Sequence, residues 1–184
     1  MTDYFSLQKR AAEAIRAIDP ETPIVIESNM MDSPEQFPYL PALELKDVIY
    51  QVHMYVPGGY THQGLGSANS PARPKYPDPD RGWDREFLKK ALVHVRDFEQ
   101  RHGARIFVGE FSAMCYAEGA DKYIADCISI FKEYGWDWTY HAFREWEGWS
   151  VEHTTKDGIK KPRDVIPSAD NPRKRVLIRG LKGE

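Results

Sequence analysis

The sequence of 184 residues predicts an α/β fold in which four parallel strands and their helices form one domain, residues 1–184. The first observation is the order of elements, because segments with helical periodicity alternate with short apolar segments. The second is the segment 105–110, whose apolar residues run without polar alternation, as is typical of a strand buried on both faces. The third is that polar and aromatic side chains follow the predicted strands, where parallel sheets carry their chemistry.

The first predicted elements are a helix over 4–18 and a strand over 23–27. Asp3 can cap the helix, and Pro20 prevents its continuation. The connection over 28–46 is rich in proline and acidic residues, so it has room for only a short helix. The apolar residues of the first helix recur at helical spacing and form one stripe: Leu7, Ala11, Ala14, Ile15 and Ile18.

The second strand is predicted over 48–55, and it ends in a histidine and a tyrosine. Because side chains alternate along a strand, Gln51, His53 and Tyr55 share one face, and the opposite face is more apolar. The connection that follows, up to Gly82, is longer than a routine loop, and such loops are usually functional or disordered.

The second half of the chain continues the alternation. Its predicted elements are a helix from Asp84 to Gly103, a strand over 105–110, a helix over 120–134, a strand over 136–143 and a helix from Asn171 to Leu181. Asp84 is a cap residue, and glycines end two of these helices. A second long connection is predicted over 145–167. The basic residues of the last helix are predicted to form a solvated face: Arg173, Lys174, Arg175, Arg179 and Lys182.

Composition excludes several classes of partner. A formal net charge of −3 gives no electrostatic footprint for nucleic acid or an anionic membrane. No apolar run approaches the roughly 20 residues that a membrane span needs, and no signal peptide is visible, which leaves the localisation open. Cys115 and Cys127 are too few and too far apart for a disulfide framework.

The sequence implies no metal and no other cofactor. There is no His-Glu-x-x-His string among the six histidines, and no phosphate-binding glycine loop follows a strand. Zinc needs three or four convergent ligands, whereas His94 and His102 lie on or beside a helix, away from the strand ends.

The candidate site consists of side chains at strand ends, with Glu110 at its centre. His53, Tyr55, Glu110 and His141 all fall where predicted strands end. A carboxylate held by a tyrosine hydroxyl and a histidine stays ionised and oriented, as a glycosyl nucleophile requires. Glu110 could instead begin a solvated loop, and His53 could be a satisfied core histidine.

Three strings of this sequence together resemble the second half of a glycoside hydrolase family 5 barrel, the clan that includes cellulases and mannanases. They are His53-x-Tyr55, then Val108-Gly109-Glu110-Phe111, then the aromatic segment 136–140. The resemblance implies half of a TIM (β/α)8 barrel. It also implies that Glu110 is the nucleophile of a retaining mechanism, and that His53 and Tyr55 orient the carboxylates.

The family also has an aromatic platform for the sugar on the eighth strand. His141 or Phe143 stands near that place in this chain, so Trp146 and Trp149 are candidates to replace the platform. Their rings suit flat, hydroxyl-rich ligands such as sugars, although aromatic rings also dominate protein cores. The predicted substrate-binding residues are therefore His141, Trp146 and Trp149.

One family feature is absent from this sequence. The general acid of the family lies in an Asn-Glu-Pro string, and no such string occurs here. Glu27, Glu35 and Glu145 are the candidates for a replacement, and Glu27 is the best of them because it ends the first strand.

Four parallel strands leave two open edges, which a second copy could cover. We therefore expect a homodimer or larger assembly of half-barrels that hydrolyses a β-linked glucan or a related polysaccharide, with activity that is impaired or depends on assembly because the general-acid half is absent. The alternative is a non-catalytic, carbohydrate-binding or structural half-barrel.

Overall fold

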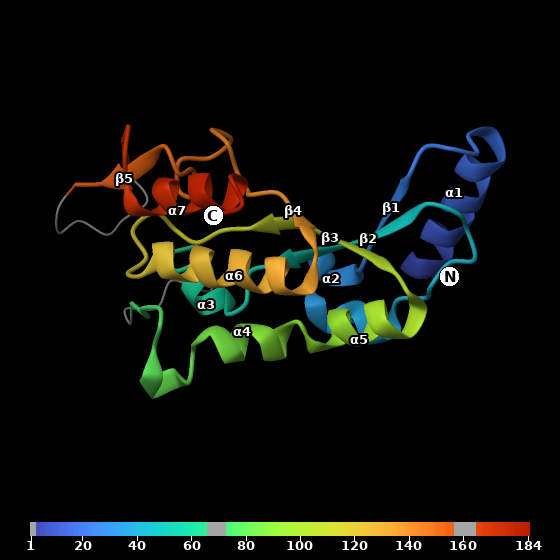
Figure 1. The fold of residues 1–184 in the computed structure, drawn as a ribbon, viewed down its shortest axis with the longest axis horizontal. Helices are drawn as coiled ribbons and strands as arrows, with labels where there is room; N and C mark the ends of the chain where they lie inside the picture. The colour runs from blue at the N-terminus through green and yellow to red at the C-terminus, as the bar shows by residue number, and fades with distance from the viewer. Residues whose placement is uncertain (1–2, 66–72, 157–164) are drawn as a thin grey trace.

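A four-stranded parallel sheet with the strand order β1-β2-β3-β4 lies at the centre of the computed structural model, which describes residues 3–65, 73–156 and 165–184 (Figure 1). Its strands are β1 (Ile24–Glu27), β2 (Val48–Met54), β3 (Arg105–Phe111) and β4 (Asp137–Trp138). Each strand runs parallel to its neighbour, so their carboxyl ends lie at one edge. The predicted α/β fold with four parallel strands is confirmed.

The long helices are α1 (Tyr4–Ile18), α4 (Arg85–Ala91), α5 (Val93–His102), α6 (Ala120–Tyr134) and α7 (Pro172–Leu181). The Asp3 and Asp84 carboxylates accept hydrogen bonds from backbone amides in the first turns of α1 and α4, which confirms both as caps. The helix predicted from Asp84 to Gly103 is divided at Leu92, whose φ of −93° and ψ of 2° interrupt the helical backbone.

The shorter elements are α2 (Asn29–Asp32), η1 (Pro34–Tyr39), α3 (Gly58–Thr61), η3 (Pro79–Arg81) and an antiparallel pair, β5 (His153–Thr155) with β6 (Val165–Pro167). The pair lies within the connection predicted over 145–167, of which residues 157–164 are outside the described residues. Residues 66–72 of the first long connection are outside them too.

The last strand of the sheet is shorter than the segment 136–143 that was predicted. Only Asp137 and Trp138 pair as a strand with β3. Beyond them, Thr139 and His141 donate backbone hydrogen bonds to Val108 and Phe111, at 2.9 and 3.3 Å. These bonds keep the chain beside β3, so His141 still reaches the carboxyl edge of the sheet.

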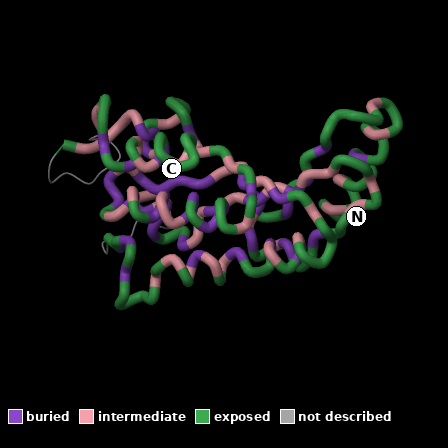
Figure 2. The backbone as a smooth tube through the Cα atoms, viewed as in Figure 1, coloured by how far each residue is buried: buried purple, intermediate pink, exposed green. Residues whose placement is uncertain are grey.

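The core lies between the sheet and the helices α4, α5 and α6 (Figures 1 and 2). Tyr50 and Phe111 each meet a helix through an aromatic pair, with Phe98 of α5 and Phe131 of α6, at centroid distances of 4.8 and 5.2 Å. Tyr50, Val52 and Met54 are buried on this side of β2, as its alternation predicts. The other face of β2, which carries the candidate site, is only half-buried.

Helix α1 departs from the other helices because its apolar stripe is exposed. It lies at one end of the molecule (Figure 1), and only its Ala12 is buried. Leu7 and Ile18 are 57% and 87% exposed. Helix α1 contributes Ala12 to the core and packs Phe5 against it. It also makes a polar contact with β1, in which the Gln8 side chain bonds both the backbone N–H and the C=O of Glu27. The stripe predicted from sequence is thus present, and all five of its residues are exposed.

Candidate active site

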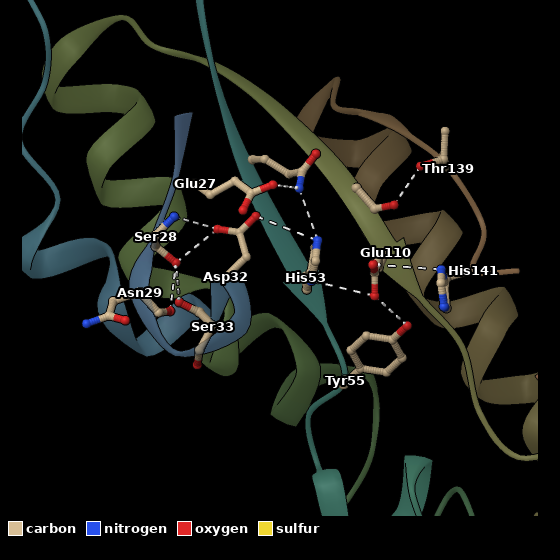
Figure 3. Close-up of polar contacts among 12 residues, drawn as sticks. Glu27, Ser28, Asn29, Asp32, Ser33, His53, Tyr55, Glu110, Thr139 and His141 are labelled. Atoms are coloured by element: carbon tan, nitrogen blue, oxygen red, sulfur yellow. Dashed lines mark hydrogen bonds and ion pairs between the residues drawn. The ribbon is translucent and has the colours of Figure 1, made fainter. Parts of the chain in front are cut away.

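Glu110 lies at the carboxyl end of β3, between side chains of β2 and of the segment after β4 (Figure 3). The Tyr55 hydroxyl donates a hydrogen bond of 3.0 Å to its Oε2 atom. His53 Nδ1 lies 3.6 Å from Oε2, and His141 Nδ1 lies 3.7 Å from Oε1. With 31% of its side chain exposed, Glu110 is neither in bulk water nor sealed in the core. The structure therefore brings four of the predicted site residues together.

A register shift between β2 and β3 produces this juxtaposition. Val52 pairs with Val108, but the next residue, His53, pairs with Glu110, so Gly109 is the extra residue of a bulge. Such bulges redirect side chains near active sites. The shift places the imidazole of His53 opposite the carboxylate of Glu110.

Burial and charge hold Tyr55 and His53 in defined protonation states. Burial, followed by the charge of Glu110, raises the pKa of the Tyr55 phenol well above its usual value, so it remains a donor. Burial lowers the pKa of His53, although the Glu110 charge opposes that shift. A neutral imidazole therefore predominates at neutral pH.

A buried aspartate that sequence reasoning missed lies behind His53. Asp32 is 1% exposed, and its Oδ1 atom accepts hydrogen bonds from the backbone N–H and the hydroxyl of Ser28, at 2.7 and 3.0 Å. Its Oδ2 atom lies 3.8 Å from His53 Nε2, and the Gln51 side chain also interacts with the Asp32 carboxylate. Burial raises the pKa of Asp32 to about 7. In the sequence, Asp32 was one acidic residue among several in a loop.

A cavity of about 310 Å³ opens in front of Glu110. Its walls include Met30 and Met31, which a left-handed turn presents with φ angles of 52° and 56°. Trp149 forms another wall, and its ring stacks on the ring of Tyr55 at a centroid distance of 5.1 Å. The cavity thus combines one carboxylate with apolar and aromatic surface, a composition typical of ligand sites.

The two predicted sugar-binding tryptophans occupy different places. Trp149 lines the cavity and donates its indole N–H to the carbonyl of Thr61 at 3.3 Å. Trp146 packs edge-on against Trp149, at a centroid distance of 5.2 Å, and is not among the residues that line this cavity. Phe143 is 72% exposed and lies beneath the Arg144 guanidinium.

Arg173 holds the segment that carries Trp149, and its position corrects a prediction. It was assigned to the solvated face of the last helix, but it is only 5% exposed. Its guanidinium donates hydrogen bonds to the carbonyls of Trp149, Ser150 and His153, at 3.2, 2.8 and 2.7 Å. The cluster of carbonyls explains the burial, because five N–H donors in a fixed plane can satisfy several acceptors together.

The three candidate replacement acids differ in their relation to Glu110. Glu145 Oε2 lies 3.4 Å from Nε2 of His141, the histidine whose Nδ1 faces Glu110. Glu27 accepts a hydrogen bond of 3.0 Å from Gln51, which in turn contacts His53. Glu35 is exposed in η1.

Within the ranges that the structure describes, no three His, Cys, Asp or Glu side chains are grouped so that they could hold a metal ion. No helix found there has the length and apolar character needed to cross a membrane.

The parallel strands and the outer helices define a partial (β/α)8 barrel, and the candidate site lies at the carboxyl edge of its strands, where barrel enzymes carry their active sites. A family model described as cellulase, glycosyl hydrolase family 5, matches residues 2–146. The chain belongs to this family.

Two curated relatives are endoglucanase C of Acetivibrio thermocellus and endoglucanase C307 of Clostridium sp. strain F1. Each is 25% identical over an alignment of 169 positions, and the match covers 76% of this chain and 49% of the relative. The chain thus spans about half the length of these relatives.

Solved structures have the same fold over nearly all of this chain and about half of their own chains. Thermotoga maritima Cel5A in complex with cellobiose matches 96% of this chain and 53% of its own, with a TM-score of 0.75 and 21% identity. The cellulose synthase subunit Z of Clostridioides difficile matches 95% and 55%, with a TM-score of 0.73 and 15% identity. The chain therefore corresponds to part of the barrel in these proteins.

Proposed function

We propose that this protein hydrolyses a β-linked glucan by a retaining mechanism in which Glu110 is the nucleophile. The observation that carries the proposal is the Glu110 carboxylate, held by Tyr55 and flanked by His53 and His141 at the mouth of a 310 Å³ cavity. Membership in the cellulase family supports the substrate class, and so do the names of the endoglucanase relatives.

In the proposed first step, a Glu110 oxygen attacks the anomeric carbon and the glycosidic C–O bond breaks. The departing oxygen takes up a proton, and the sugar remains bound to Glu110 as an ester. Water then attacks the same carbon, the bond to the Glu110 oxygen breaks, and the proton that water loses balances the proton taken up by the leaving group. The Tyr55 hydroxyl occupies Oε2, which leaves Oε1 on the side of His141 as the attacking atom.

The step that lacks an evident catalytic residue in this chain is protonation of the leaving group. A retaining glycosidase places its second carboxyl group about 5–5.5 Å from the nucleophile, and loss of acid assistance costs on the order of 10²–10⁴-fold. The Asn-Glu-Pro string of the family is absent from the sequence. We therefore propose that hydrolysis of natural glucans is impaired or depends on assembly, with Glu27, Glu35 and Glu145 as the candidate donors.

Assembly into a homodimer or larger oligomer of half-barrels is part of the proposal. Within the described residues, β1 and β4 each pair on one side only. The exposed stripe of α1 adds apolar surface that a second copy could bury, since large exposed apolar patches mark interaction sites.

The leaving group makes the proposal testable. Dinitrophenolate leaves without protonation, so the protein should hydrolyse a dinitrophenyl β-cellobioside far faster than a soluble β-glucan. Glu110→Gln should reduce this rate by about 10³-fold or more, because the nucleophile is lost. The exposed Glu21→Gln variant is the matched control.

Proton NMR of the first product formed tests the stereochemistry, and retention predicts the β-anomer. Equal rates for wild type and Glu110→Gln would reject the nucleophilic role. Binding of cello-oligosaccharides without turnover of either substrate would favour the second candidate, a non-catalytic carbohydrate-binding half-barrel, which the missing acid string also suggests.

A further inference from the structure

We infer that Gln51 is a positioning residue that fixes the tautomer of His53 and so directs a ring N–H at Glu110. The catalytic meaning of this inference rests on the proposed function. Its geometry does not, because the contacts of Gln51 with its neighbours can be tested without any substrate.

The contacts of Gln51 define which way its amide points. Its Nε2 atom lies 3.0 Å from Glu27 Oε1 and 3.1 Å from His53 Nε2. A carboxylate oxygen only accepts hydrogen bonds, so the NH₂ group, and not the carbonyl oxygen, must face Glu27. The NH₂ group has two protons, one for Glu27 and one for the histidine. The Gln51 amide is therefore a double donor that joins the ends of β1 and β2.

This orientation decides which nitrogen of His53 carries the proton. Because Nε2 accepts from Gln51, the single proton of the neutral ring lies on Nδ1. Nδ1 is the nitrogen 3.6 Å from Glu110 Oε2 (Figure 3). The opposite tautomer would set an N–H against the N–H of Gln51 and a lone pair against the carboxylate. Both contacts would be repulsive, so the observed arrangement favours the ionised, oriented nucleophile.

Asp32 is the competitor for the same nitrogen. Its Oδ2 atom lies 3.8 Å from His53 Nε2, and its carboxylate also interacts with the Gln51 side chain. An ionised Asp32 would draw the ring proton toward Nε2. Since burial raises the pKa of Asp32 to about 7, the carboxyl is mostly neutral in mild acid and does not draw the ring proton to Nε2. The other ionisable groups that act on His53 are Glu27, Glu110 and His141.

Gly109 provides the space that this arrangement needs. A Cβ atom at position 109 would overlap the Cδ and Oε1 atoms of the Gln51 side chain. Only glycine lets the Gln51 side chain lie against β3 at the bulge. Gly109 thus affects His53 on the neighbouring strand indirectly, because it leaves the space in which Gln51 reaches the histidine.

The test is the tautomer itself, measured on the whole protein. Two-bond ¹H–¹⁵N NMR of ¹⁵N-histidine protein distinguishes the tautomers, and a His53→Asn spectrum assigns the signals. Wild type at pH 6.5 should show His53 with its proton on Nδ1. Gln51→Met keeps the length of the side chain but removes the donors, and the proton should move to Nε2. Gln100→Met, an exposed substitution on α5, is the matched control and should leave His53 unchanged.

A second variant protects the test against a failure of Gln51→Met to fold. Gly109→Ala should displace Gln51 and produce the same change of tautomer, whereas Gly59→Ala, whose Cβ would meet no atom within 4 Å, should not. For the dinitrophenyl substrate, Gln51→Met should lower kcat by about 10-fold with little change in KM, because the oriented nucleophile is affected and not binding.

Two results would overturn the inference whether or not the protein hydrolyses any substrate. One is a wild-type His53 with its proton on Nε2, and the other is a proton that stays on Nδ1 in both variants. The predicted tautomers without hydrolysis would instead leave the positioning role intact and count against the proposed function.

Discussion

At the end of β3, the two oxygens of Glu110 meet different neighbours. Oε2 accepts from Tyr55 and faces His53, whereas Oε1 faces His141. Sequence alone predicted these residues at strand ends, because strand periodicity and the position of each side chain are local properties. The distances between them depend on the register of β2 against β3, and the bulge at Gly109 sets that register.

The Tyr55 hydroxyl gives the first prediction at this scale. Tyr55→Phe removes a hydrogen bond to a charged group, worth about 1.5–3 kcal/mol, so kcat/KM for the dinitrophenyl substrate should fall about 10- to 100-fold. Thermal unfolding should change little, because the ring keeps its stacking on Trp149. Tyr39→Phe, at a tyrosine that is 70% exposed, is the control. An unchanged rate for Tyr55→Phe would contradict the role of the hydroxyl.

Asp32 gives a prediction on stability against pH. Its folded-state pKa of about 7 lies above the ordinary value near 3.9, so the native state binds this proton more tightly than the unfolded state does. The stabilisation from this bound proton is therefore fully present below about pH 4 and is lost progressively as the pH rises to about 7, by up to about 4 kcal/mol. Asp32→Asn cannot ionise and should be the more stable protein at pH 8, with the difference decreasing toward pH 4.

Urea unfolding of wild type and Asp32→Asn at several pH values measures this difference. Asp80→Asn, at an exposed aspartate, is the control for a change of net charge. Parallel pH profiles for wild type and Asp32→Asn would show that burial does not raise the pKa of Asp32 in the folded state.

At the scale of elements, the caps and periodicities of the helices were predictable, but the surroundings of the last helix were not. Asn171 caps α7 by accepting from the backbone N–H of Lys174, which a local pattern can reveal. Arg173 is two residues away in sequence, yet it enters a cluster of carbonyls from the segment 149–153. No local sequence pattern reveals that cluster, because its acceptors are backbone carbonyls, which every residue type has.

Arg173 gives the prediction at this scale. Arg173→Lys keeps the charge but loses the planar set of donors, so buried carbonyls are left unsatisfied and the free energy of unfolding should fall by about 2–4 kcal/mol. Arg179→Lys, at an exposed position of the same helix, should have no such effect. Chemical denaturation followed by tryptophan fluorescence measures both variants, and equal stability of the two would contradict the anchoring role.

For the whole molecule, the exposed apolar side chains of α1 give the last prediction. We expect a homodimer or larger oligomer in sedimentation velocity at micromolar concentration. Leu7→Glu combined with Ile18→Glu should dissociate it, since both side chains are exposed and apolar. Lys9→Glu, on the same helix, should leave the assembly intact. A dispersed wild-type monomer over the whole concentration range would reject the proposed assembly.

The sequence by itself determined the order of the long helices and of the four strands of the parallel sheet, and the family, because these follow from local periodicity, caps and short motifs. Only the tertiary structure decided that Asp32 lies buried behind His53, that Gln51 joins Glu27 to His53, and that Arg173 is inside. Those outcomes depend on contacts between segments that are far apart in the chain. Such contacts determine how deeply each side chain is buried and which groups surround it, and these in turn set its protonation state and its orientation. No local sequence pattern encodes them.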